Sequence, residues 1–210
     1  MRSRSSRRKI VLATSNPGKL REIRRSFQGL RLRLLSLRDI GARGGVEENG
    51  KTFLENAILK SLAYSRLSEH PTLAEDSGLE VEYLKGEPGV RSARYSDPVA
   101  TDEKNIRKVL RILEGVPWPE RRARFVCQLV LSQRGRVLKT CRGEVHGTIA
   151  LKKTGNRGFG YDPIFYYRPL GRTFGELRPW EKNAVSHRGR ALEKMRAYLL
   201  RTARAGKTGK

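Results

Sequence analysis

The chain has 210 residues, of which 37% are hydrophobic, and a formal net charge of +24. This length suits one large domain or two lobes that share a core, and the apolar residues gather in periodic runs, unlike those of a disordered chain. No run approaches the ~20 apolar residues of a membrane-spanning helix, and two cysteines cannot supply a four-ligand zinc site. We therefore expect a reduced, cytoplasmic protein without a membrane segment or a secretion signal.

The positive charge makes nucleic acids, nucleotides and other polyphosphates the first partners to consider. Residues 1–9 and 201–210 carry nine basic residues and no acid. The predicted organisation is a folded domain over residues 9–202 between basic tails at 1–8 and 203–210. Residues 45–84, by contrast, hold eight acids and three bases. This acidic island predicts a divalent cation site, although a charge run often marks only a solvated face.

The first elements follow one another closely. Lys9–Thr14 is a short apolar run typical of a strand, and Pro17–Phe27 has helical spacing of its apolar residues. Ser15 or Asn16 can cap this helix, whose first turn suits proline. Leu32–Ser36 is a second strand candidate.

A second helix is predicted from Thr52 to about Leu67, because Thr52 and Glu55 have the spacing of a capping box. The alternative for Glu55 is therefore that it caps this helix and has no further role. The predicted buried face of this helix comprises Leu54, Ala57, Ile58 and Leu62.

Two short strands are predicted next, Thr72–Glu75 and Leu79–Leu84, separated by a turn at Ser77-Gly78. This interpretation places Asp76 at the end of a strand.

Thr101 opens a third helix that Gly115 ends, and its apolar stripe comprises Ile106, Val109, Leu110 and Leu113. Arg124–Ser132 and Arg136–Ile149 have the pattern of a hairpin about Gly135. The last helix starts near Ser186; it is expected to bury Leu192, Met195 and Leu199 and to expose Arg190, Lys194 and Arg196. Strands mixed with helices predict an α/β fold with a mixed sheet.

Three segments could carry chemistry. The first is Thr14-Ser15-Asn16-Pro17-Gly18-Lys19, a strand-to-helix turn whose free N–H groups and lysine attract phosphate. It lacks the spacing of a P-loop, which disfavours a Walker-type ATPase. The alternative is an ordinary capped turn.

The second segment is Glu75-Asp76, adjacent carboxylates whose side chains point to opposite faces of a strand and so have different tasks. Mg²⁺ binds few carboxylates and completes its shell with water and phosphate, which one or two of these acids together with Glu48 can satisfy. The alternative is an acidic pair in a turn.

The third segment joins glycines, aromatics and an acid in Gly158–Pro163, followed by Lys182 and His187-Arg188. Aromatic rings with Arg and Lys suit stacking on a base and pairing with phosphate. The alternatives are a glycine-rich turn with buried aromatics, and a histidine that only starts a helix. Neither a zinc-hydrolase His-Glu-x-x-His nor a Gly-x-Ser-x-Gly elbow occurs.

Taken together and in order, six segments resemble the inosine triphosphate pyrophosphatase family over about Lys9 to Leu200. They read ATSNPGKLREI from residue 13, TFLENAILK from 52, AEDSGL from 74, PGVRSARYS from 88, GFGYDPIF from 158 and EKNAVSHRG from 181. The sequence differs from the family at two positions, Ser15 where glycine is frequent and Glu75 where aspartate is frequent. The second leaves open how Glu75 and Asp76 divide their roles.

The resemblance implies an elongated, two-lobed α/β fold with a central cleft, and a Mg²⁺-dependent homodimer that hydrolyses ITP, XTP and dITP to the monophosphate and pyrophosphate. It implies Asp76 and Glu75 as catalytic residues and Glu48 and Asp76 as metal ligands. The residues that it implies for the nucleotide are Thr14, Ser15, Asn16, Pro17, Gly18, Lys19, Ser77, Phe159, Gly160, Tyr161, Asp162, Lys182, His187 and Arg188.

Two other functions remain open from the sequence. The net charge of +24 and the basic ends also fit an RNA-associated protein without enzymatic activity. A pyrophosphatase for modified pyrimidine nucleotides could share the fold and read another base. An enzyme with basic tails could in addition contact RNA weakly.

Overall fold

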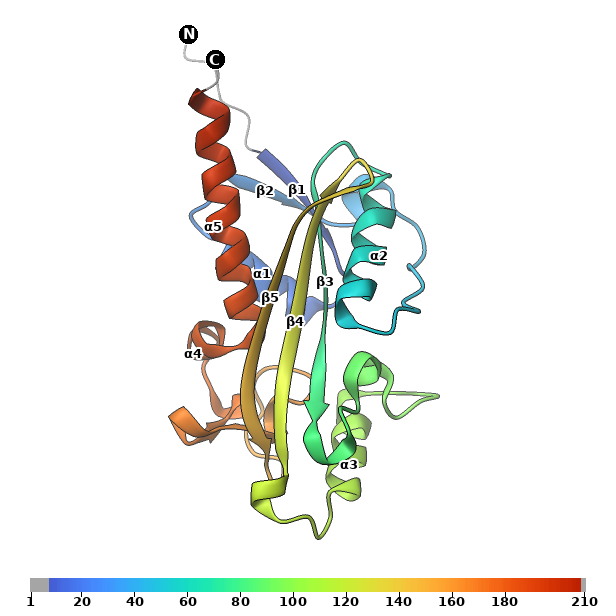
Figure 1. Cartoon of the computed structure of the whole chain (residues 1–210), viewed down its shortest axis with the longest axis vertical. Helices are drawn as coiled ribbons and strands as arrows, with labels where there is room; N and C mark the ends of the chain where they lie inside the picture. The colour runs from blue at the N-terminus through green and yellow to red at the C-terminus, as the bar shows by residue number, and fades with distance from the viewer. Residues whose placement is uncertain (1–7, 209–210) are drawn as a thin grey trace. The chain divides into compact units, whose positions relative to one another are not determined.

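A computed structural model describes residues 8–208 and contains one seven-stranded sheet in the order β2-β1-β3-β4-β5-β6-β7 (Figure 1). The sheet is mixed, because β1 pairs in parallel with β2 and β3 whereas β6 pairs antiparallel with β5 and β7. The strands are β1 (Arg8–Ala13), β2 (Leu32–Leu35), β3 (Thr72–Val81), β4 (Arg122–Gln133), β5 (Arg136–Ile149), β6 (Phe165–Tyr167) and β7 (Arg172–Thr173). The α-helices are α1 (Pro17–Ser26), α2 (Phe53–Ser65), α3 (Asp102–Ile112), α4 (Pro179–Val185) and α5 (His187–Thr208). The predicted α/β class with a mixed sheet is confirmed.

The chain divides into two compact units. Unit 1 contains the chain up to Glu75, residues 128–141 and the chain from Leu192, whereas unit 2 contains residues 76–127 and 142–191. Three strands (β3, β4 and β5) and α5 each contribute residues to both units. Because the division falls between Glu75 and Asp76, the two predicted catalytic carboxylates are neighbours in the chain but belong to different units.

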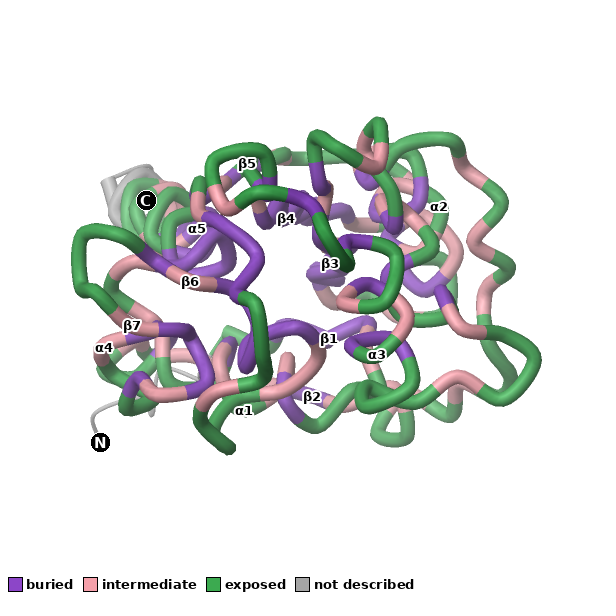
Figure 2. Tube along the Cα trace, turned by 90° about the horizontal axis from the view of Figure 1, so that it is seen from below, coloured by how far each residue is buried: buried purple, intermediate pink, exposed green. Residues whose placement is uncertain are grey.

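The core of unit 1 includes β1, whose residues Ile10 to Ala13 are all nearly inaccessible to solvent (Figure 2). A strand with parallel neighbours on both sides is covered on both faces, which explains its continuous apolar sequence. Ile23 and Phe27 complete the apolar face of the α1 segment. The predicted strand and helix are confirmed.

Helix α2 buries a different face from the one predicted. Of the predicted stripe only Ala57 is buried, while Leu54, Ile58 and Leu62 are half-buried. Ser61 and Tyr64 are buried instead. The Ser61 hydroxyl lies 2.5 Å from that of Ser132 in β4 and donates to main-chain oxygens of the sheet. Small and polar residues let α2 approach the strands closely, and periodicity of apolar residues cannot detect such a face.

The predicted turn at Ser77-Gly78 is wrong, because β3 runs unbroken from Thr72 to Val81. Asp76 therefore lies inside a strand and not at its end. Serine and glycine favour turns in isolation, but pairing with neighbouring strands overrides local propensity. Only the short 3₁₀ turn Glu82–Leu84 replaces the end of the second predicted strand.

The core of unit 2 is aromatic. The rings of Phe125 and Phe165 have centroids 4.5 Å apart, and Phe174 lies 4.9 Å from Phe165. Ile106 and Val109 of α3 belong to the same cluster of buried residues. This cluster supports the segment Gly158–Asp162 between β5 and β6, since Tyr161 and Ile164 are part of it.

The remaining predictions are largely confirmed. Arg134 and Gly135, both with positive φ, join β4 to β5 as a two-residue hairpin turn. Helix α5 buries Leu192, Met195 and Leu199. Arg196 is half-buried and not exposed, because its guanidinium donates to the main-chain oxygens of Ser26 and Gln28.

Both ends of the folded chain reach into the segments predicted as tails, since β1 begins at Arg8 and α5 ends at Thr208. The predicted tail residues 1–7 and 209–210 lie outside the described residues. Helix α4 and the short strands β6 and β7 were not predicted from the sequence.

Candidate active site

The predicted phosphate-binding segment is the turn from β1 into α1. Asn16 caps the helix, because its Oδ1 accepts from the main-chain N–H of Lys19 at 3.1 Å. The main-chain N–H of Asn16 in turn donates to Thr14 Oγ1 at 3.2 Å. The first turn of α1 has no acidic residue, so its N–H groups and dipole favour an anion.

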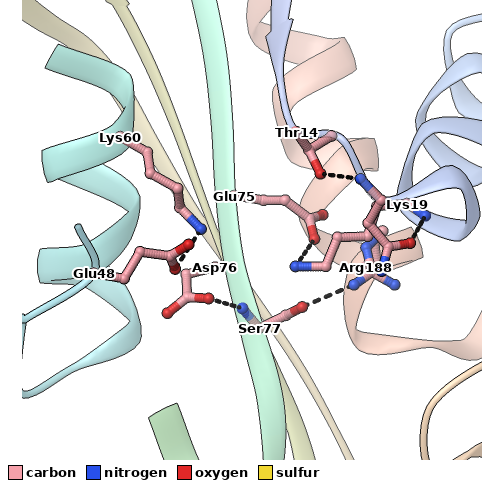
Figure 3. A network of polar contacts seen from close by, with 9 residues as sticks. Thr14, Lys19, Glu48, Lys60, Glu75, Asp76, Ser77 and Arg188 are labelled. Carbon is pink, nitrogen blue, oxygen red and sulfur yellow. Dashed lines mark hydrogen bonds and ion pairs between the residues drawn. The ribbon is translucent and has the colours of Figure 1, made fainter. Parts of the chain in front are cut away.

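Lys19 forms an ion pair with Glu75 in unit 1. The Lys19 Nζ lies 2.9 Å from Glu75 Oε1, and the Glu75 side chain is 1% exposed (Figure 3). A carboxylate this deeply buried needs a close cation, and the lysine supplies it. The lysine that sequence analysis assigned to phosphate therefore also neutralises a buried acid.

A second ion pair in unit 1 lies within the acidic island and joins Glu48 to α2. Lys60 Nζ lies 2.7 Å from Glu48 Oε2, and both side chains are partly buried (Figure 3). Lys60 was not predicted as a site residue. It lies within the segment TFLENAILK, one of the six that indicate the family, and that position is the signal by which it could have been found.

In unit 2, Asp76 and Ser77 of β3 lie beside a buried arginine. Asp76 is 7% exposed, and its Oδ1 accepts from the main-chain N–H of Ser77 at 3.0 Å. Arg188 is 2% exposed and donates through Nη2 to Ser77 Oγ at 2.8 Å (Figure 3). Glu75 and Asp76 extend to opposite sides of β3, as consecutive residues of a strand must.

The segment Gly158–Asp162, which we call the glycine loop, folds around Asp162. Gly158 has φ +78°, and Asp162 Oδ2 lies 2.0 Å from where its Cβ would be, so only glycine fits there. The same carboxylate oxygen accepts from the main-chain N–H of Phe159 and from Lys182 Nζ. Phe159 lies under two cations, with Lys182 Nζ 4.5 Å and the Arg188 guanidinium 5.4 Å from the ring centroid.

Two contacts from distant parts of unit 2 also hold the glycine loop. Asp102 at the start of α3 accepts from the main-chain N–H of Gly160 at 2.7 Å. The Tyr161 hydroxyl donates to the main-chain oxygen of Ser92 at 2.8 Å, and burial raises the pKa of Tyr161 far above its ordinary value, so it stays a donor. Asp102 was not predicted as a site residue, because an acid in the first turn of a helix is common without any function.

Three comparisons with known proteins identify the family of the chain. Residues 10–198 match the model of the Ham1 family. The chain belongs to the Ham1 family. A relative from Geobacter sulfurreducens named dITP/XTP pyrophosphatase is 49% identical over 91% of this chain and 96% of its own. One of the same name from Escherichia coli K12 is 44% identical over 88% and 94%.

Solved structures of Ham1 proteins have the same fold. A HAM1 protein from Coxiella burnetii has a TM-score of 0.85 at 41% identity, over 92% of this chain and 99% of its own. A nucleoside-triphosphatase / dITP/XTP pyrophosphatase from Mycobacterium abscessus has a TM-score of 0.71 at 39% identity, over 89% and 97%. These matches confirm the resemblance that the six segments indicated.

His187 occupies the start of α5 in this Ham1 chain. It is 4% exposed, and its ring stacks on Phe125 with centroids 4.7 Å apart and planes at 16°. This position agrees with the alternative that His187 starts a helix, and the ring packs against the aromatic core of unit 2.

The carboxylates suit a hard cation with few protein ligands. Among residues 8–208, no three His, Cys, Asp or Glu side chains gather into a metal-binding cluster. Oxygen ligands of one or two carboxylates, with water and phosphate completing the shell, are the pattern of Mg²⁺.

Both cysteines, Cys127 and Cys141, are free and buried. No helix in the described part of the chain is long and apolar enough to span a bilayer.

The predicted site residues fall into two sets. Unit 1 holds the turn Thr14–Lys19, Glu48 and Glu75, whereas unit 2 holds Asp76, Ser77, Phe159, Gly160, Tyr161, Asp162, Lys182, His187 and Arg188. Within the sets, the structure joins Lys19 to Glu75, Arg188 to Ser77, and Lys182 to Asp162 and Phe159. Their roles in catalysis remain predictions.

Proposed function

We propose that the protein hydrolyses non-standard purine nucleoside triphosphates, namely dITP, XTP and ITP, to the nucleoside monophosphate and pyrophosphate. The names of relatives at 40–49% identity support this reaction. The observation that carries the base preference is the buried Arg188 guanidinium beside the face of Phe159. A flat ring for stacking next to a cationic donor suits a purine with a carbonyl group.

The triphosphate is proposed to bind at the turn Thr14–Lys19. The capped start of α1 offers main-chain N–H groups, and Lys19 adds a positive charge at the same turn. Charge that develops on the leaving pyrophosphate is then stabilised by Lys19 and Lys182. Since each lysine is paired with a carboxylate, Glu75 or Asp162, the pairs must loosen or share their cation when phosphate binds.

Glu48 and Asp76 are proposed to bind Mg²⁺, which would polarise the phosphate oxygens when bound. Asp76 is proposed to orient the attacking water and accept its proton. Its environment supports this role, because the main-chain N–H of Ser77 fixes one carboxylate oxygen. Glu75 forms an ion pair with Lys19, which supports Glu75 as the residue that positions this lysine.

The base is proposed to be read by Arg188. Hypoxanthine and xanthine carry a carbonyl at C6, which accepts from a guanidinium, whereas the amino group of adenine leaves donors facing one another. An unpaired buried donor costs ~1–3 kcal/mol, which corresponds to roughly ten- to a hundredfold discrimination. Ser77 supports this reading by holding the Arg188 side chain in place.

We further propose that the enzyme is a cytoplasmic homodimer, and that its basic tails make a weak contact with RNA. Free buried cysteines suit a reducing compartment. Light scattering of the purified chain tests the dimer, which requires twice the mass of the monomer; a monomeric mass at working concentration would refute it.

Pyrophosphate release from ITP, XTP, dITP, GTP, ATP and dUTP in the presence of Mg²⁺ tests the reaction. We expect ITP, XTP and dITP to exceed ATP by at least ~10-fold in kcat/KM. Preference for dUTP would assign the chain to pyrimidine nucleotides. Absence of release from every nucleotide, together with salt-dependent RNA binding, would instead favour a non-enzymatic RNA-associated protein.

Chelation of Mg²⁺ should stop the reaction. Full activity without divalent cations would refute the assignment of Glu48 and Asp76 as metal ligands.

A further inference from the structure

A cavity of about 510 Å³ beside α3 is lined mainly by cations. Its four basic residues follow one another at intervals of three, one and three along α3, so they share one face of the helix. The cavity, which we call the α3 groove, is lined by Lys104, Arg107, Lys108, Arg111, Ser96 and Asp97, all in unit 2. None of them takes part in the proposed hydrolysis.

The contacts of the two lysines fix their position but leave their charge in place. Lys108 Nζ donates to the main-chain oxygen of Tyr95 at 2.7 Å and lies 4.1 Å from the centroid of its ring. Lys104 Nζ donates to the main-chain oxygen of Val99 at 2.9 Å. These partners are neutral, and Asp97 is the single acid that lines the groove. The groove is therefore a preformed concentration of positive charge.

The shape of this charge fits a chain of phosphates. From Lys104 to Arg111 the helix advances ~10 Å at 1.5 Å per residue. The phosphates of one strand rise about 3.4 Å per nucleotide along the axis of a duplex and lie farther apart in an extended single strand, so roughly two to three phosphates match this length. A single carboxylate or phosphate ion would use only part of the row.

The groove has no exposed aromatic ring on which a base can stack. Tyr95 is 4% exposed and is covered by Lys108. Sequence-tolerant binding of single strands combines a basic groove with stacking platforms, and only the first of these is present. Contacts to the backbone position a strand without reading its bases, so the expected binding does not depend on base sequence.

Asp97 favours RNA over DNA as the ligand of the groove. A carboxylate in a basic groove repels phosphate, but it can accept a hydrogen bond from a ribose 2′-hydroxyl, which DNA lacks. Its side chain is 43% exposed and lies 3.9 Å from Arg91, which leaves it accessible. We propose that the α3 groove binds the sugar-phosphate backbone of single-stranded RNA, with the four cations on phosphates and Asp97 on a 2′-hydroxyl. This activity is independent of the proposed hydrolysis.

Fluorescence anisotropy of the full chain with a labelled short oligouridylate, and with the oligodeoxyuridylate of equal length, tests the proposal because the two probes differ only in the 2′-hydroxyl. The main variant is R107E/R111E. The matched control is R21E/R25E on α1, which makes the same charge change at the same spacing of four on another exposed helix.

We expect R107E/R111E to weaken RNA binding at least ~10-fold at low salt and to reduce the slope of log affinity against log salt by about 1.4, which is two phosphates at 0.7 each. R21E/R25E should change the affinity less than ~3-fold. Arg107 and Arg111 are exposed, so R107E/R111E should keep the circular dichroism and nucleotide turnover of the wild type. D97A should bring the affinities for the two probes together.

Equal loss in R107E/R111E and R21E/R25E would overturn the proposal, because net charge alone would then explain binding. So would loss of binding on deletion of residues 1–7 with R107E/R111E unaffected, which would assign RNA to the tail. Displacement of RNA by stoichiometric inorganic tripolyphosphate would make the groove a site for free oligophosphate. Loss of self-association in R107E/R111E without a change in RNA binding would make it an interface between copies of this chain.

Discussion

The phosphate turn Thr14–Lys19 and the glycine loop Gly158–Asp162 are organised in different ways. The turn is shaped by its own neighbours, since Asn16 bonds to Thr14 and Lys19. The glycine loop is held by residues up to 69 positions away, namely Asp102, Ser92 and Lys182. Under the proposed function, the first region serves the triphosphate that all substrates share, and the second serves the base that distinguishes them. Damage to the two regions should therefore have different kinetic consequences.

The largest effect is expected at Asp76, which follows Glu75 in β3. Asp76→Asn should lower turnover by ~100-fold or more, since a positioned general base contributes ~10²- to 10⁴-fold. Nucleotide binding should survive, because the phosphate turn and Arg188 are unchanged. Steady-state kinetics with equilibrium binding of ITP measures both. Near-normal turnover would end the assignment of Asp76 as base.

Glu75→Gln is the companion measurement. It removes the charge that holds Lys19 but leaves Asp76 in place, so we expect a smaller loss of turnover and a change in KM. A loss as large as that of Asp76→Asn would show that the two carboxylates act jointly.

Arg188→Ala tests base reading in unit 2. Its kcat/KM for ITP should fall ~10- to 100-fold, whereas the low value for ATP should change much less, because the guanidinium attracts one C6 substituent and repels the other. The ratio of ITP to ATP therefore narrows. Equal losses for both nucleotides would reassign Arg188 to the phosphates.

Lys182→Ala sharpens the same comparison. If Lys182 contacts phosphate, kcat/KM should fall by the same factor for ITP and ATP, since the triphosphate is common to both. The variant also leaves Asp162 buried without this cation, so its Tm should drop. A selective loss for ITP would show that Lys182 acts through Phe159 and belongs to base reading.

Asp102→Ala is expected to have a moderate effect. Asp102 touches no proposed substrate position and acts by fixing Gly160, so KM for dITP should rise ~3- to 10-fold with kcat nearly unchanged, as for one lost hydrogen bond. Asp102→Asn keeps an acceptor oxygen and should restore most of the loss. Failure of this rescue would mean that charge, not positioning, matters at α3.

The smallest expected effect is on stability in acid. The main-chain N–H of Arg178, followed by the Arg172 guanidinium, lowers the pKa of Glu181 below 4.5. Because the pKa of Glu181 is lower in the folded than in the unfolded protein, this carboxylate stabilises the fold at pH values above its unfolded pKa. The contribution is lost as the pH falls through the folded pKa. Glu181→Gln should therefore flatten the decline of Tm below about pH 4.5, and an unchanged profile would exclude Glu181 as a contributor.

Local patterns predicted the first region well. A short apolar run followed by Asn16 and Pro17 identifies β1, its capped turn and α1, because all the interactions involved lie within a few residues. The hairpin at Gly135 and the buried stripe of α5 were predictable for the same reason. Six segments in order also indicated the family, since their combination is far more specific than any one of them.

Other features depended on contacts between distant residues. The sequence of β3 predicts a turn at Ser77-Gly78, and only the neighbouring strands keep it extended. Apolar periodicity missed the buried face of α2, because Ser61 packs through hydrogen bonds to the sheet.

The sequence by itself therefore determined the α/β class, the family and the residue types of both regions. The tertiary structure alone decided which carboxylate each lysine neutralises, that Asp102 fixes Gly160, and that the cations of α3 line one cavity. The physical reason is that helix caps and turns are satisfied by neighbours a few residues away, whereas a buried charge takes its partner from whichever element the fold brings within ~4 Å.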